Sequence, residues 1–106
     1  MNFKDYQKQA VKTAIYSPAV DTVYPALGLA SEAGEVAGKV KKYMRDGGSY
    51  IMLRDQLLDE LGDVLWYVAA IARDLDIELE EIAEHNIKKL KDRQSRGVIS
   101  GSGDYR

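Results

Sequence analysis

The chain has 106 residues, of which 45% are hydrophobic and 30% charged, the balance of one small globular domain. It contains no cysteine, which excludes disulfides, zinc–cysteine sites and thiol catalysis. A net charge of −2 argues against general nucleic-acid binding, because neutralising phosphates requires an excess of Lys and Arg. No apolar run is long enough to span a membrane, and the first residues lack the apolar core of a signal peptide, so we expect a cytoplasmic protein.

Apolar residues at helical spacing predict two helices in the first half of the chain. The first extends from Phe3 to Ser17, because Pro18 pushes the residue before it out of the helical conformation. The second starts at Pro25, whose missing N–H is not needed in a first helical turn. It continues to about Met44, shortly before two consecutive glycines that favour a stop.

Two further helices are predicted in the second half, from about Leu53 to Asp74 and from about Glu78 to Arg93. The third helix is apolar on both faces, so it needs cover on both sides, from a second subunit, a ligand or both. No strand pattern competes, and the fold class is therefore all-α. We expect a helical domain over residues 1–94 and a tail over 95–106 whose Gly and Ser content favours flexibility unless it docks onto another surface.

Two pairs of acidic residues lie three positions apart within the predicted second and third helices. The pairs are Glu32 with Glu35 and Glu60 with Asp63. Each pair projects from one side of its helix, so two antiparallel helices could bring all four carboxylates together. Such an oxygen-rich site suits Mg²⁺ or Mn²⁺ better than softer metals. The alternative is that these are solvated surface carboxylates, some of them paired with Lys39 or Lys42.

The sequences GLASEAGEV over residues 28–36 and DELGDVLWY over 59–67 resemble the MazG-like nucleotide pyrophosphohydrolases of the all-α NTP pyrophosphatase superfamily. The resemblance spans nearly the whole chain, with Ser31 standing where the family pattern has a glutamate. It implies a four-helix bundle-type fold with its core completed in a homodimer or homotetramer. It also implies that Glu32, Glu35, Glu60 and Asp63 hold Mg²⁺, with Mn²⁺ as a possible substitute.

The same resemblance implies that the substrate lies between the second, third and fourth helices. Asn86 and Lys89 have the spacing of the family's substrate-contacting segment, and Arg93 follows them on the same helix. Lysine and arginine there suit phosphate oxygens, although a solvated helix end would look the same. Tyr67 is a candidate to stack on the base, or else a core aromatic. Lys39 is a candidate phosphate ligand, or else an ion-pair partner of the acidic residues.

The function implied is Mg²⁺-dependent hydrolysis of a nucleoside triphosphate, ribo or deoxyribo, to a monophosphate and pyrophosphate. An activated water would attack the α-phosphorus, and we hypothesise that Glu35 is the catalytic base. Two alternatives stay open: a phosphoribosyl-ATP pyrophosphohydrolase, and a non-catalytic helical module that dimerises through its apolar third helix. The Gly-rich tail, with Arg at both ends, resembles tails in a subset of the family and could close over phosphates; plain disorder is the alternative.

Overall fold

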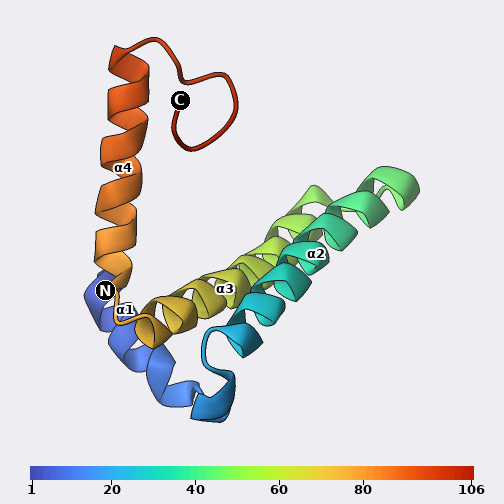
Figure 1. The fold of residues 1–106 in the computed structure, drawn as a ribbon. Coiled ribbons are helices and arrows are strands. Elements are labelled where there is room, and N and C mark those ends of the chain that lie inside the picture. The colour runs from blue at the N-terminus through green and yellow to red at the C-terminus, as the bar shows by residue number, and fades with distance from the viewer.

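The computed structural model describes all 106 residues and contains helices and no strand, which confirms the all-α prediction (Figure 1). Its centre is an antiparallel hairpin of two long helices, α2 (Val23–Asp46) and α3 (Tyr50–Asp74). The short helix α1 (Phe3–Ala10) packs against α3, and α4 (Leu79–Ser95) starts beside α1 and points away from the hairpin. Two single 3₁₀ turns, Val11–Thr13 and Pro18–Val20, connect α1 to α2.

Local signals fix the turn between α2 and α3. Gly47 has a φ of 74° and Gly48 a φ of 124°, conformations that glycine adopts without strain. The Ser49 hydroxyl then accepts a hydrogen bond from the Met52 N–H at 3.3 Å and caps α3. Because of this cap α3 begins three residues before the predicted start, whereas the predicted end at Asp74 is confirmed.

The first helix is shorter than predicted and ends at Ala10. The Trp66 indole N–H of α3 donates to the Ala10 carbonyl at 3.2 Å and to the Thr13 hydroxyl at 2.7 Å, and that hydroxyl donates back to Ala10. The Trp66 and Thr13 side chains thus satisfy the Ala10 carbonyl, which a longer helix would have bonded. The backbone is extended at Ala14 and again at Ser17, so the prediction of a helix to Ser17 is wrong.

A glutamine joins α1 to the corner between α3 and α4. The Gln7 side chain donates to the Ile77 carbonyl at 3.0 Å and accepts from the Leu79 N–H at 2.9 Å. Four alanines and Leu79 are the buried hydrophobic residues at and around this corner: Ala10, Ala69, Ala70, Ala72 and Leu79. The start of α4 is therefore held by hydrogen bonds between the Gln7 side chain and the backbone, and by packing against small buried residues.

A buried carboxylate holds the connection before α2. Asp74 has a fully buried side chain that accepts from the Tyr16 hydroxyl and the Thr22 N–H, both at 2.8 Å, and from Arg73 at 2.8 Å. Burial alone would raise the pKa of Asp74, but these three donors outweigh it and lower the pKa below 3.8. Thr22 has a φ of 67°, a strained value for threonine that the Asp74 hydrogen bond helps to hold.

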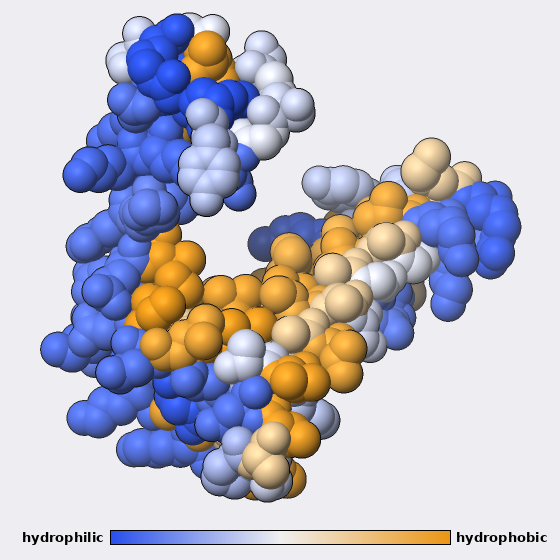
Figure 2. All heavy atoms as spheres, in the orientation of Figure 1, coloured by the Kyte–Doolittle hydropathy of each residue, from blue (hydrophilic) through white to orange (hydrophobic).

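The four helices do not close into a bundle within one chain. The radius of gyration is 16.5 Å, whereas a compact domain of this length has about 13 Å. Only seven residues are buried, and apolar side chains lie open along the hairpin and on the inner side of α4 (Figure 2). The apolar side chains of Ile82, Ile87 and Leu90 on α4 are 38%, 51% and 39% exposed. Completion of the core by a second chain stays a prediction.

Candidate metal centre

Three of the four predicted acidic ligands come together on the hairpin. Glu32 of α2 and Glu60 and Asp63 of α3 each place one carboxylate oxygen within 4.8 Å of the others. Glu60 and Asp63 lie on one side of α3 because residues three apart are neighbours on a helix surface. Glu32 and Glu60 are half-buried and Asp63 is exposed, so the cluster opens to solvent on one side.

The three carboxylates repel one another. The pKa of Glu32 is raised above 4.5 by burial first, then by the charge of Asp63, by contact with the Glu60 carboxyl and by the charge of Glu35. A divalent cation would relieve this repulsion, and an all-oxygen donor set fits Mg²⁺ or Mn²⁺. The donors present therefore fit the metal that the sequence predicts.

Glu35, predicted as the fourth ligand and as the catalytic base, lies outside the group of three. It is exposed on α2, one helical turn beyond Glu32, and its charge still contributes to the raised pKa of Glu32. A residue beside a metal site and free of its ligand shell suits a base better than a ligand. Both assignments to Glu35 stay predictions.

Tyr67 lies next to the acidic cluster. Its pKa is raised by burial, by the neighbouring Tyr24 and by the charges of Glu32 and Asp63. The ring packs so closely on α2 that a Cβ at Gly28 would overlap it. Its centroid is 5.0 Å from that of Trp66 and 6.5 Å from that of Tyr24. Tyr67 is thus both a packing residue between α2 and α3 and a neighbour of the candidate metal centre.

Lys39 lies farther along α2, toward the turn of the hairpin. It is half-buried and lines a hollow of about 350 Å³ together with Lys42, Asp46 and Ser49. No ion pair joins either lysine to Glu32 or Glu35, so the predicted pairing does not form. Two cations therefore remain free on the same hairpin as the acidic cluster.

The structure does not bring the predicted substrate residues of α4 to the acidic cluster of the same chain. Helix α4 meets the other helices only near its first turns, and its second half, which carries Lys89 and Arg93, stands away from the hairpin (Figure 1). Asn86 is exposed, and Lys89 is half-buried. Arg93 is only 5% exposed, because the C-terminal segment covers it.

The C-terminal tail is docked on α4 instead of being left free. The Arg106 guanidinium donates to the carbonyls of Val98 at 3.0 Å and Ile99 at 2.8 Å, and Arg96 donates to the Arg106 carbonyl at 2.8 Å. Both terminal arginines of the tail thus bond within it. Asp104, which accepts a hydrogen bond from Lys89, was not predicted from the sequence. Its one signal there is that it is the single acidic residue in an otherwise Gly-, Ser- and Arg-rich tail.

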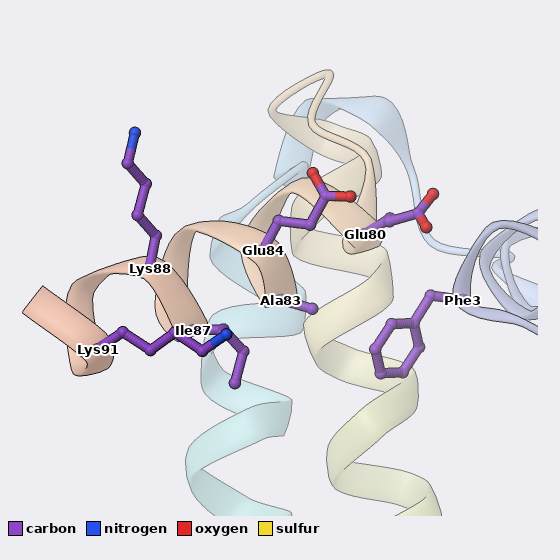
Figure 3. A pocket seen from close by; sticks show the side chains of 7 residues that line it. All are labelled: Phe3, Glu80, Ala83, Glu84, Ile87, Lys88 and Lys91. Atoms are coloured by element: carbon purple, nitrogen blue, oxygen red, sulfur yellow. The ribbon is translucent and has the colours of Figure 1, made fainter.

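A second hollow, of about 540 Å³, lies between α1 and α4 (Figure 3). Phe3 of α1 faces Ala83 and Ile87 of α4 across it, and charged residues stand around the rim. None of the predicted site residues lines this hollow. Its apolar floor makes it a candidate contact surface more than a site for a charged substrate.

The fold and the cluster define an all-α protein with a carboxylate site suited to a hard divalent cation. The MazG nucleotide pyrophosphohydrolase domain matches residues 25–98, and the chain belongs to this family. A curated relative, the "Gene 37 protein" of Mycobacterium phage L5, is 47% identical over 114 aligned residues that cover both chains completely. No solved structure matches the chain. None of the helices of this protein combines the length and apolar composition needed to cross a bilayer.

Proposed function

We propose that this protein hydrolyses nucleoside triphosphates, NTP or dNTP, to the monophosphate and pyrophosphate with Mg²⁺ as its cofactor, in the cytoplasm. The observation that carries the proposal is the group of three carboxylate oxygens within 4.8 Å in a chain of the MazG family. A pyrophosphohydrolase needs such a group to hold a divalent cation, because the cation neutralises the several negative charges of the substrate. Mg²⁺, when bound, neutralises phosphate charge and acidifies water.

In this proposal different residues of the chain bind the metal, accept the proton and contact the substrate. Glu32, Glu60 and Asp63 hold the cation, and Glu35 accepts the proton of the water that attacks the α-phosphorus. Lys39, Lys89 and Arg93 supply charge-assisted hydrogen bonds to phosphate oxygens, and Asn86 with Tyr67 contacts the nucleoside.

A second copy of the chain would complete the site. The cations of α4 lie away from the acidic cluster of their own chain, while α2, α3 and α4 all expose apolar side chains. We propose a homodimer or homotetramer in which these faces pack together and α4 of one chain approaches the hairpin of another. The hollow between α1 and α4 is part of the surface available for that contact.

The activity is tested by incubating the protein with a panel of NTPs, dNTPs and phosphoribosyl-ATP, with Mg²⁺, with Mn²⁺ or with chelator, and measuring monophosphate and pyrophosphate. We expect metal-dependent hydrolysis and at least about 100-fold loss in Asp63→Asn, because several kcal/mol of charge stabilisation depend on the cation. Asp59→Asn, an exposed acid one turn away on α3, is the matched control and should keep full activity.

The role of Glu35 is tested separately by metal titration and turnover of Glu35→Gln. As a base it should keep metal affinity and lose turnover, whereas near-full turnover with metal bound would exclude it. Equal activity of Asp63→Asn and Asp59→Asn, or hydrolysis that persists in chelator, would contradict the proposed function. Cleavage of phosphoribosyl-ATP alone would assign the second enzymatic alternative, and no cleavage of any compound would favour the non-catalytic helical module.

A further inference from the structure

One acidic side chain of the tail occupies the cationic pair of α4. The Asp104 carboxylate oxygen Oδ1 lies 3.2 Å from Lys89 Nζ and 3.5 Å from Arg93 Nη2. The same Arg93 guanidinium donates to the backbone carbonyl of Asp104 at 2.8 Å. A single anionic oxygen thus bridges two cations, as a phosphate oxygen between a lysine and an arginine would.

The two cations and the carboxylate differ in how accessible they are. The Arg93 side chain is 6% exposed and that of Lys89 31%, whereas the Asp104 carboxylate is 77% exposed. The ion pairs of Asp104 lie at the solvent boundary, where such pairs contribute little to stability. A ligand can therefore approach the carboxylate from water and take its place.

The tail is built so that it could leave α4 as one unit. Arg106 ties Val98, Ile99 and Gly103 together inside the loop, and these bonds do not involve Lys89 or Arg93. The residues around Asp104 connect the end of the loop to Lys89 and Arg93 of α4, and Arg96, directly after α4, donates to the Arg106 carbonyl.

We propose that Asp104 is an internal competitor of substrate phosphates: it neutralises Lys89 and Arg93 in the free protein, and a polyphosphate binds there by displacing it and lifting the end of the tail. This inference rests on the phosphate-binding part of the proposed function and adds its regulation. A tethered group acts at an effective concentration of about millimolar. Ligands that offer one weakly bound oxygen therefore do not displace Asp104 from Lys89 and Arg93, whereas pyrophosphate and triphosphate groups do.

The experiment measures pyrophosphate binding by calorimetry to the full chain in chelator, so that no cation bridges pyrophosphate to the acidic cluster. Asp104→Asn keeps the backbone carbonyl that Arg93 bonds and removes the competing charge. We expect it to bind pyrophosphate about 3-fold to 10-fold more tightly, the range for loss of two ion pairs at the solvent boundary. Asp92→Asn changes net charge equally but breaks only the pair with Arg96, so it should match wild type. Lys89→Gln should bind more weakly.

NMR relaxation of the tail backbone provides the second measurement. Pyrophosphate should increase the mobility of residues 103–106 in wild type, and Asp104→Asn should show that mobility without ligand. Unchanged or weaker binding by Asp104→Asn, no detectable binding by any variant, or a tail that becomes more rigid when pyrophosphate binds would each overturn the inference. Weaker binding in Lys89→Gln with no change in Asp104→Asn would overturn it and leave the proposed phosphate role of α4 standing, which hydrolysis assays test independently.

Discussion

At the scale of single residues, Asp74 should make folding sensitive to acid. Its pKa is lower in the folded chain, so its stabilising contribution is complete above the usual pKa of an aspartate and is lost as pH falls through the folded value. We expect Asp74→Asn to lower the free energy of unfolding at neutral pH by about 2–3 kcal/mol, because it disrupts a buried carboxylate with three donors. Thermal unfolding, followed by circular dichroism from about pH 7 to about pH 3, measures the loss of stability and its acid dependence, because carboxylates titrate in about this range.

Asp76→Asn is the matched control for this prediction. Asp76 is exposed, two residues along the chain, with a φ of 57° that aspartate and asparagine both tolerate. The Asp76→Asn substitution should leave the free energy of unfolding and its dependence on pH close to those of wild type. If both variants kept the same acid dependence as wild type, Asp74 would not be the group responsible.

The acidic residues of the site and of the fold differ in how far the sequence predicts their positions. Glu32, Glu60 and Asp63 were predictable because helical spacing fixes which side chains share a face, and a hairpin of two helices brings two such faces together. Asp74 was not, because its partners Tyr16 and Thr22 lie 58 and 52 positions earlier and only the tertiary fold brings them near.

At the scale of elements, the packing of α2 on α3 depends on the absence of a side chain at Gly28. Alanine is normally favoured over glycine inside a helix, but here its Cβ would overlap the Tyr67 ring. We expect Gly28→Ala to destabilise the chain by about 1–3 kcal/mol, as overpacking does, with the ring displaced from its place beside Glu32. Denaturant unfolding measures the loss, and tyrosine fluorescence or NMR reports the ring.

Gly38→Ala serves as the comparison within the same helix. Nothing lies within 4 Å of a Cβ at Gly38, so the substitution should stabilise α2 by up to about 1 kcal/mol in the single chain. Equal effects of the two substitutions would contradict the close contact between Gly28 and Tyr67.

Helix boundaries were predictable where local sequence sets them and not elsewhere. The end of α2 and the start of α3 follow from Gly47, Gly48 and the Ser49 cap, all adjacent in sequence. The end of α1 depends on Trp66, which lies 56 residues beyond Ala10, so no local signal could give it.

At the scale of the whole molecule, the helical class followed from the apolar periodicity, but the direction of α4 did not. That direction is set at one corner, where Gln7 bonds the backbone at Ile77 and Leu79. A periodic pattern shows that a helix has an apolar face and says nothing about which surface covers it. Ile82, Ile87 and Leu90 carry such a face, and within one chain it stays open.

The open apolar surface predicts that the chain forms oligomers. A single charged side chain placed on that surface should weaken them. Leu58 is 68% exposed on α3, in an apolar stretch with Leu57 and Leu61. We expect the wild-type chain of 11.8 kDa to sediment as a dimer or tetramer and Leu58→Glu to shift it toward the monomer, since burying an unpaired carboxylate in an interface is unfavourable. Ile15→Glu, at a side chain that is 98% exposed and outside the helices, should leave the assembly intact.

The same assembly decides where the substrate site lies. If α4 of one chain serves the acidic cluster of another, mixing inactive Asp63→Asn with inactive Lys89→Gln should regain part of the wild-type hydrolysis, because some mixed oligomers hold one site with both residues intact. A site built within one chain would gain nothing from mixing. Adding Leu58→Glu to both variants should abolish the recovery, because chains that stay apart cannot share a site.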